Sequence, residues 1–331
     1  MGGNRRPRRG SMAYYPRKYS KRIVGRVRSW PLWISEVKLL GFAGYKVGMI
    51  HLFRIDNNPN SPFYGREIFC PATVLEAPPL LIGGVRFYSS DPYGLKVFKE
   101  IWWTNLPKNV FRKIPPIKNA SKTNYEKIRE EMIKKIDSID QIRAICITQP
   151  WLTSIGKKTP EIMEIPISGD KEKAIEMAFK ILGKEVHIKD VFKPGQYIDV
   201  ISISKGKGFE GVIKRFGVKI LPRWHKHRKG HRRIGSVGPT KPAIMFMTPR
   251  PGQTGFHQRT EYNKLVLKIG NNPSEINPKG GFKHYGIIRN EYMIIEGSVP
   301  GAIKRLIRLR DAIRAKSLNV EPPQITYINI R

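Results

Sequence analysis

The sequence has few acidic residues for its length. Only 26 Asp and Glu stand against 61 Lys and Arg among the 331 residues, so the formal net charge is +35. An excess of this size repels itself in a compact chain unless a polyanion supplies the opposite charge. Nucleic acid is the first candidate for that polyanion, and an anionic membrane surface is the second. The scarcity of acid therefore predicts a partner of opposite charge.

Membrane and secretion signals are also missing. No apolar run approaches the ~18 residues of a membrane span, and the amino terminus has no signal-peptide pattern. Residues 1–6 begin like a myristoylation site but have Arg6 where Ser or Thr is required. The only two cysteines, Cys70 and Cys146, lie in separate apolar runs, which is typical of buried thiols in a reducing compartment. We therefore expect a cytoplasmic protein with no membrane partner.

Motifs for catalysis are absent as well. The chain has no nucleophile elbow, no HExxH and no dinucleotide-binding fingerprint. Acids that would act as general acid–base groups on RNA are sparse in the most basic segments. We therefore expect a protein that is not an enzyme, needs no cofactor and has no small-molecule substrate. The alternative is an RNA-modifying enzyme or a free translation factor.

The positive charge is concentrated in two segments. Residues 1–30 carry ten basic side chains and no acid, and their apolar residues show no sustained period, so we expect an arm without its own core. Residues 205–264 carry fifteen Lys and Arg and two acids, Glu210 and Glu261. The remaining residues have an ordinary mixture of charges, and 40% of the chain is hydrophobic. This distribution predicts a folded body with two basic projections.

The apolar pattern of the body predicts short strands on both sides of a helical region. The strand-like segments are apolar and are bounded by Gly or Pro. They are residues 41–53, 67–76, 80–88, 197–203, 262–269, 285–295 and 302–309. Short strands with this punctuation favour a small β-barrel.

The region between the two groups of strands has a different pattern. Residues 121–136 and 170–182 place apolar residues at helical spacing, and residues 141–148 resemble a buried strand. Ser121 is the candidate cap of the first helix, and Asp170 and Gly183 are expected to begin and end the second.

We divide the chain accordingly. The predicted parts are an N-terminal arm at 1–35, a discontinuous barrel at 36–88 and 190–310, an inserted α/β unit at 89–189, a basic central extension at 205–260 and a C-terminal tail at 311–331.

A stretch rich in glycine and lysine follows the predicted strand at 197–203. Glycine lets a backbone approach phosphates closely, and Lys205 and Lys207 would neutralise their charge. The stretch is not a nucleotide-binding P-loop, which needs Gly-Lys-Ser/Thr at the end of a six-residue loop. For the glycines and lysines alone, a flexible surface turn is an equal alternative.

Residues 224–231 combine a tryptophan, three histidines and several cations. His225, His227 and His231 suggest a metal site, since imidazole is a common ligand. The nearby cations oppose a divalent ion, however, and no Cys or carboxylate completes the set, so we expect no metal. We favour RNA contact, with cations on phosphates and Trp224 stacked on an unpaired base. A hydrophobic anchor at the base of the extension is the alternative for Trp224.

Motifs along most of the chain resemble the ribosomal protein L3 family. The most specific match is the stretch 192–217, which resembles the family signature. Its matching residues are Phe192, Asp199, Ser202, Ser204, Gly206, Lys207, Gly208, Gly211 and Arg215. Residues 41–49 resemble the first barrel strand of the family, 252–261 the return limb of its central extension and 297–301 its closing turn. The basic arm and the insertion match the archaeal and eukaryotic form, because bacterial relatives are shorter.

The resemblance implies a fold and a function. The fold is mainly β: a six-stranded barrel of the translation-protein type with an α/β insertion, a basic N-terminal arm and a long central loop. The function is that of a structural component of the large ribosomal subunit. Such a component binds large-subunit rRNA early in assembly and has neighbouring ribosomal proteins as further partners.

The resemblance also implies that the tip of the central loop supports the peptidyl-transferase centre. The residues expected in this loop are Gly235, Gly238, Pro239, Thr240, Lys241 and Pro242. Archaeal relatives commonly have tryptophan where this chain has Thr240, so the role of that tryptophan does not carry over.

The residues that we expect to bind RNA belong to the two basic segments and are basic, aromatic or amide side chains. They are Arg5, Arg6, Arg8, Arg9, Arg17, Lys18, Lys205, Lys207, Lys214, Arg215, Arg223, Trp224, His225, Lys226, His227, Arg228, Lys229, His231, Arg232, Arg233, Lys241, Gln253, His257 and Arg259.

Overall fold

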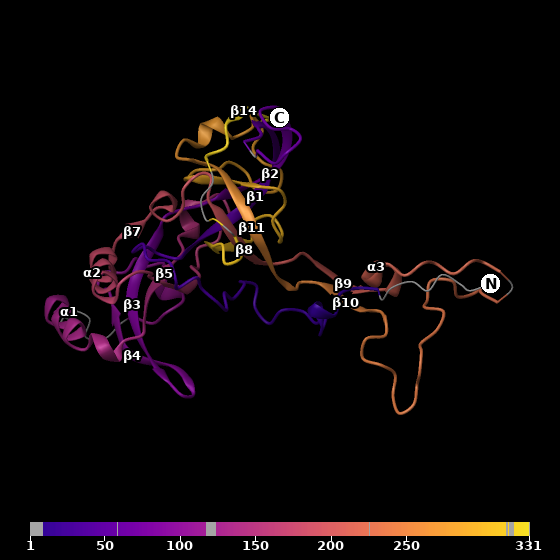
Figure 1. Cartoon of the computed structure of the whole chain (residues 1–331), viewed down its shortest axis with the longest axis horizontal. Helices are drawn as coiled ribbons and strands as arrows, with labels where there is room; N and C mark the ends of the chain where they lie inside the picture. The colour runs from indigo at the N-terminus through magenta and orange to yellow at the C-terminus, as the bar shows by residue number, and fades with distance from the viewer. Residues whose placement is uncertain are drawn as a thin grey trace. The chain divides into compact units, whose positions relative to one another are not determined.

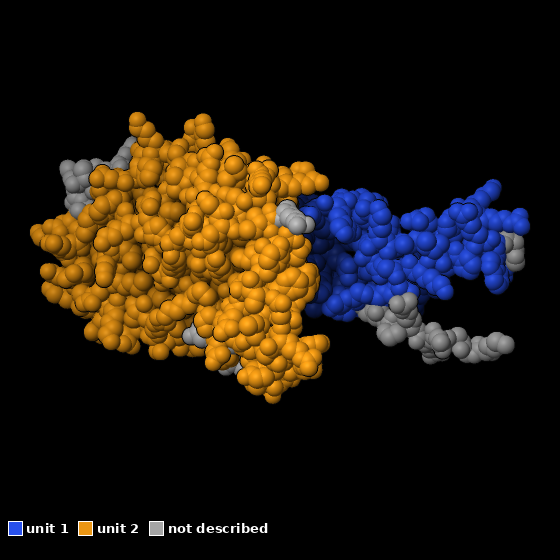
Figure 2. Space-filling model, turned by 90° about the horizontal axis from the view of Figure 1, so that it is seen from above, with its two compact units in different colours: residues 1–23, 203–259 blue, residues 24–202, 260–331 orange. Residues whose placement is uncertain are grey.

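The computed structural model describes residues 9–57, 59–116, 124–224, 226–315, 317 and 321–330. The chain divides into two compact units, which Figure 2 colours separately. The first consists of residues 1–23 and 203–259, and we call it the basic unit. The second consists of residues 24–202 and 260–331, and we call it the body.

Within the described residues, the body contains a closed ring of six strands. In ring order these are β13 (Leu306–Asp311), β8 (Tyr197–Ile203), β11 (Gln258–Gly270), β12 (Tyr292–Glu296), β2 (Glu67–Glu76) and β1 (Gly41–Ile55). Strand β1 closes the ring by pairing with β13, and its second half also pairs with β14 (Ile325–Ile328). The predicted mainly β fold is therefore confirmed, and its barrel has the predicted number of strands.

Closure of the ring requires a glycine at the start of β1. Gly41 lies opposite Arg310 in the antiparallel pairing with β13. A Cβ added to Gly41 would lie 2.5 Å from the carbonyl oxygen of Leu309 and 2.8 Å from the Trp30 ring. Any side chain here would push β13 or the segment around Trp30 away from β1.

A second sheet lies in the region where we predicted the α/β insertion. Its strands run in the order β4 (Gly94–Trp102), β3 (Leu80–Asp91), β5 (Gln141–Ile147) and β6 (Ile162–Pro166), and β7 (Glu185–Val186) pairs with the start of β3. Helices α1 (Tyr125–Lys134) and α2 (Lys171–Ile181) lie beside this sheet (Figure 1). The ring of Phe179 on α2 packs 6.4 Å from that of Phe87 on β3.

The strand predicted at 80–88 does not belong to the barrel. It is β3, which pairs with β4 on one side and with β5 on the other. Its first six residues are all buried, as expected for a central strand covered on both faces. An apolar run predicts a buried strand but does not say which sheet it joins, so the insertion begins near Leu80 and not at residue 89.

The two predicted helices are present with shorter bounds. The side chain of Asn124 caps α1 by accepting hydrogen bonds from the N–H groups of Glu126 and Lys127; the predicted cap, Ser121, lies outside the described residues. Helix α2 follows Asp170 as predicted, but that carboxylate makes no capping hydrogen bond and lies 3.6 Å from Lys173 Nζ. Gly183 follows the end of α2 with a φ of 75°.

One hydrophobic core joins the barrel to the insertion. It contains Phe42, Val74 and Ile294 from the ring as well as Met132 and Ile175 from the two helices. Both cysteines are free and buried, as expected.

The described residues also include short 3-10 helices, which are η1 (Met12–Tyr14), η2 (Val110–Arg112), η4 (Ile136–Ser138), η5 (Pro150–Leu152), η6 (Ile188–Asp190) and η7 (Pro273–Glu275).

Both predicted terminal segments differ from the expectation. Within the predicted arm, residues 24–35 belong to the body, where Arg310 Nη1 donates to the carbonyl oxygen of Ser29 (2.6 Å). The predicted tail contains a paired strand, β14. In both cases, segments without a clear apolar period gain their order from contacts with distant parts of the chain.

The basic unit is built on a two-stranded ribbon. Strand β9 (Gly206–Glu210) pairs antiparallel with β10 (Gly252–Gly255), and helix α3 (Val212–Phe216) follows β9. The Gly-Lys stretch is therefore part of a strand and not an open loop. Gly255 has a φ of 75°, and a Cβ at this position would overlap the carbonyl oxygen of Lys205, so only glycine fits.

Candidate nucleic-acid interface

The basic unit has almost no negative charge of its own. Its sequence contains 22 Lys and Arg and a single acid, Glu210. The Glu210 carboxylate lies 3.4 Å from Nζ of Lys214, four residues further along the chain. Most cations of this unit therefore have no carboxylate to neutralise them, and the unit presents a strongly positive field.

Some of the predicted RNA-binding cations hold the basic unit together. The Arg215 guanidinium donates to three backbone carbonyls, those of Gln253 (3.0 Å), Arg250 (2.9 Å) and Arg17 (3.1 Å). Burial lowers the pKa of Arg215, and the positive charge of Arg17 lowers it further. Because its Nε, Nη1 and Nη2 atoms each donate to a backbone carbonyl, Arg215 maintains the shape of the surface. Arg9 likewise donates to the carbonyl oxygen of Gly217.

The arm and the central extension are not separate projections. Ser20 N–H donates to the carbonyl oxygen of Phe256 (2.7 Å), and His257 Nδ1 lies 2.8 Å from that of Lys18. The Arg259 guanidinium lies 4.5 Å from the centroid of the Tyr14 ring. The arm has little apolar material for a core, but it packs on the extension.

His257 and Gln253, two further predicted contacts, also face inward. Burial lowers the pKa of His257, and nearby arginines lower it further. Gln253 Nε2 donates to the carbonyl oxygens of Thr254 and Gly255, both at 3.2 Å. These side chains support the ribbon from which the extension continues.

The signature stretch serves folding at several of its positions. The buried Asp199 carboxylate pairs with the Arg310 guanidinium at 2.9 and 3.1 Å, and it also accepts from the Asn263 N–H at 3.1 Å. Ser204 Oγ accepts from the His257 N–H at 3.1 Å. Phe192 is buried in the core. At these positions the motif therefore serves the folding of the barrel and of the segment that follows β8.

The other predicted cations form an outward-facing set. The exposed members are Lys18, Lys205, Lys207, Lys214, Arg223, Lys226, Arg228, Lys229, Arg232, Arg233 and Lys241. Lys226, Arg228, Lys229 and Arg233 surround a hollow of about 440 Å³. Four cations around one hollow attract phosphate groups and can donate charge-assisted hydrogen bonds to them.

Trp224 lies beside this set with 67% of its surface exposed. This exposure is unfavourable to the alternative of a hydrophobic anchor. His227 and His231 are half-buried. Arg5, Arg6, Arg8 and His225 lie outside the described residues.

The predicted loop tip is open to solvent. Gly235, Gly238, Pro239, Thr240, Lys241 and Pro242 are all exposed. The base of the loop is fixed by Thr248 Oγ1, which donates to the carbonyl oxygen of Val237 at 3.3 Å. The return limb carries Phe246, which is 72% exposed.

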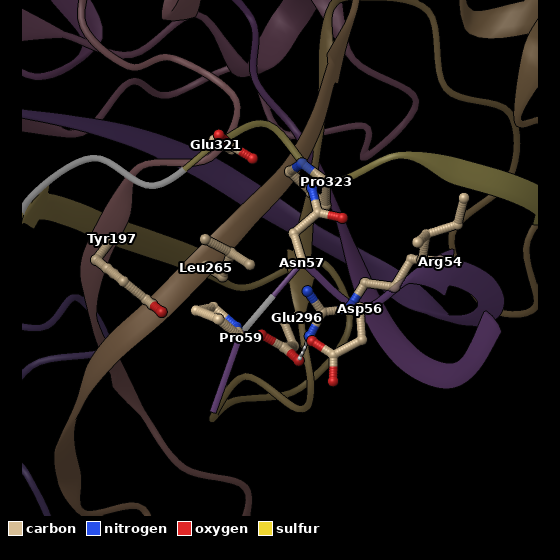
Figure 3. A pocket seen from close by; sticks show the side chains of 10 residues that line it. Arg54, Asp56, Asn57, Pro59, Tyr197, Leu265, Glu296, Glu321 and Pro323 are labelled. Carbon is tan, nitrogen blue, oxygen red and sulfur yellow. Dashed lines mark hydrogen bonds and ion pairs between the residues drawn. The ribbon is translucent and has the colours of Figure 1, made fainter. Parts of the chain in front are cut away.

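A hollow of the body has the opposite character (Figure 3). It has a volume of about 400 Å³ and is lined by Asp56, Glu296 and Glu321 together with Arg54, which pairs with Glu296 at 2.9 Å. Three carboxylates against one cation give this hollow an excess of negative charge, which disfavours phosphate. Among the described residues, no three His, Cys, Asp or Glu side chains are grouped as a metal site. No helix there is long and apolar enough to cross a membrane.

Comparison with known proteins identifies the family. The family model described as ribosomal protein L3 matches residues 2–330. The chain belongs to the ribosomal protein L3 family. The large ribosomal subunit protein uL3 of Pyrobaculum aerophilum is 52% identical over 98% of this chain and 97% of that protein. The uL3 proteins of Sulfurisphaera tokodaii and Archaeoglobus fulgidus are 47% and 45% identical over 98% of this chain, covering 96% and 97% of their own lengths.

Membership of the L3 family confirms the predicted function class. The protein is a structural constituent of the large subunit of the cytoplasmic ribosome, and its rRNA-binding role follows from the family. It is not an enzyme. The alternative of an RNA-modifying enzyme or a free translation factor is set aside.

The sequence prediction did not include some residues around a second hollow of the basic unit. Tyr15, Phe246 and Arg250 were not among the predicted contacts, although they lie close to Arg17 around a shared hollow. A signal was available for Tyr15, which stands two residues before Arg17 and Lys18, but not for Phe246, which lies in an apolar run. Their proximity across more than 200 residues of sequence was not visible.

Proposed function

We propose that the basic unit is the principal rRNA-binding surface of this large-subunit protein. Its exposed cations bind phosphates, and its inner cations, Arg215 above all, maintain the shape that presents them. The observation that carries the proposal is the hollow surrounded by Lys226, Arg228, Lys229 and Arg233 in a unit with a single acid. Phosphate contacts position a protein on RNA and supply most of its affinity.

We further propose that binding occurs early in assembly and that the loop at 235–242 supports the peptidyl-transferase centre. Cations that repel one another are stabilised most when the phosphates of the RNA are still accessible, and this favours early binding. Between residues 234 and 247 the only cation is Lys241, whereas residues 223–233 carry six. The tip is therefore suited to fitting a shaped RNA cavity, and the six cations are suited to neutralising phosphates. Neighbouring ribosomal proteins are the proposed further partners, and the body is the surface available to them.

The test compares two variants of equal charge in binding to large-subunit rRNA. In the first, six cations of the basic unit become Gln: Arg223, Lys226, Arg228, Lys229, Arg232 and Arg233. In the control, six exposed lysines of the body become Gln: Lys96, Lys108, Lys113, Lys127, Lys134 and Lys171. The slope of log affinity against log salt changes by about 0.7–0.9 per phosphate contact, so the first variant should lose roughly 4–5 units of slope.

The control variant should keep the slope of the natural protein. Equal losses in the two variants would mean that only net charge matters, and the basic unit would have no special role. An almost flat salt dependence of the unmodified protein would mean that phosphate contacts do not dominate binding at all.

A further inference from the structure

The basic unit contains a second hollow, of about 330 Å³, which differs from the cationic one. The arm contributes Tyr15 and Arg17, the end of α3 contributes Phe216, and the return limb of the loop contributes Met245, Phe246 and Arg250. This volume is at the small end of the range for sites that hold one small organic group. Segments from three parts of the sequence thus form one concave site.

The walls of this hollow offer flat groups at stacking distance from one another. The rings of Tyr15 and Phe246 have their centroids 5.4 Å apart with an interplanar angle of 59°. The Arg17 guanidinium lies 4.3 Å from the centroid of the Phe216 ring and 5.3 Å from that of Tyr15. Aromatic rings and guanidinium planes are the groups on which proteins stack unpaired bases of RNA.

The charge around the hollow selects the class of ligand. Arg17, Lys18, Arg215 and Arg250 line it, and none of its lining residues is an acid. A purely apolar ligand would gain nothing from four cations, and an inorganic anion would gain nothing from the aromatic rings. A nucleotide uses both, because its base stacks while its phosphates meet the cations.

The exposure of Phe246 supports the same assignment. This side chain is 72% exposed and Met245 is 49% exposed, although both adjoin the hollow. Large apolar side chains gain free energy when they are covered. A base inserted beside Phe246 would cover it, whereas a phosphate backbone alone would not.

Three side chains of the site, those of Tyr15, Thr248 and Arg215, already donate hydrogen bonds that hold its shape. Tyr15 Oη donates to the carbonyl oxygen of Met247 at 3.4 Å, and Thr248 Oγ1 donates to that of Val237. The Arg215 donors meet three carbonyls. Base-edge recognition needs donors and acceptors directed at the base, so we expect the base itself to be held by stacking, which tolerates any base, while Arg17 and Arg250 meet the phosphates.

We propose that this hollow binds one unstacked nucleotide of the large-subunit rRNA, with its base against Phe246 and Tyr15 and its phosphates near Arg17 and Arg250. The proposal deepens the proposed function and rests on it, since the basic unit must first lie on the rRNA. It predicts little preference among the four bases. It also assigns a binding role to Phe246, which lies outside the cationic surface.

The test measures binding of the full-length protein to large-subunit rRNA as a function of salt. Phe246→Ala removes the stacking ring. Phe209→Ala is the matched control, because Phe209 is 78% exposed on β9 of the same unit and does not line the hollow. Loss of one stacked base corresponds to ~1–3 kcal/mol, so Phe246→Ala should weaken binding by about 5- to 150-fold. Its salt slope should be unchanged, Phe209→Ala should stay within about twofold of the natural protein, and Phe246→Trp should restore affinity.

Each other outcome has a definite meaning. A loss below twofold for Phe246→Ala overturns the nucleotide site, while a steep salt dependence of the natural protein leaves the proposed function intact. Equal losses in both phenylalanine variants overturn the site as well, because they indicate unspecific aromatic contact. If Phe246→Ala leaves RNA binding unchanged but weakens binding to polyglutamate, the hollow takes an acidic peptide and not RNA. A natural protein that does not bind the rRNA refutes the proposed function itself.

Discussion

Replacement of Arg215 by Gln should release the N-terminal arm from the basic unit while leaving the body folded. The Arg215 side chain ties the arm, helix α3 and the return limb of the extension together, through the carbonyls of Arg17, Gln253 and Arg250. Glutamine is too short and has too few donors to meet all three. The arm should therefore open more often in the variant than in the natural protein.

The magnitude follows from the bond to the arm. Of the hydrogen bonds that the Arg215 side chain donates, the one to the Arg17 carbonyl (3.1 Å) reaches the arm, and a hydrogen bond from a charged donor contributes ~1.5–3 kcal/mol. The hydrogen bond from Arg17 Nη1 to the backbone carbonyl of residue 215 (3.4 Å) does not depend on this side chain. Loss of one cation beside Arg17 acts in the opposite direction by reducing repulsion. At about 0.15 M salt the Debye length is ~8 Å, which screens partly exposed charges and leaves the hydrogen bond as the larger effect.

Native-state hydrogen exchange of the free, full-length protein measures this opening. The reporter is the Ser20 amide, which donates to the Phe256 carbonyl at 2.7 Å. Its protection should fall about 10- to 150-fold in Arg215→Gln, since each ~1.4 kcal/mol corresponds to a factor of ten. Lys214→Gln is the control, because the neighbouring Lys214 pairs with Glu210. Equal protection of Ser20 in the natural protein and in Arg215→Gln would refute the role of Arg215 as a clamp.

Three further predictions concern the loop tip, the barrel and the contact between the arm and the central extension. Replacing residues 241–243 with a Gly-Ser linker should leave incorporation into reconstituted subunits nearly intact but impair peptidyl transfer or tRNA accommodation; normal activity would make the tip dispensable. Asp199→Ala should lower the free energy of unfolding by ~3–5 kcal/mol in denaturant titration, since it leaves the buried Arg310 guanidinium without its carboxylate. An NMR titration should place the pKa of His257 below its ordinary value of 6.5, because burial disfavours its charged form. The stabilisation from neutral His257 is then complete above about pH 6.5 and is lost as the pH falls below it; a pKa above 6.5 would contradict burial as the main influence on this ring.

The sequence by itself determined the class of fold and the class of partner. Strands β2 (Glu67–Glu76) and β8 (Tyr197–Ile203) have the predicted bounds. Short apolar runs between Gly and Pro leave few alternatives to a strand. The charge imbalance required a polyanion whatever the fold. The motif at 192–217 pointed to the L3 family, although at Asp199 and Ser204 the structure gives the motif a role in folding.

Only the tertiary structure decided which strands share a sheet and which cations face outward. The apolar run of β3 fits either sheet, and its place in the insertion depends on pairing with β4 and β5. The charge of Arg215 looks the same in the sequence as that of Arg228, yet one guanidinium meets three carbonyls and the other lines an open hollow. The approach of Tyr15 to Phe246 joins positions more than 200 residues apart. Local patterns of charge and hydropathy carry no information on such distant contacts, because these form only when the arm packs against the extension.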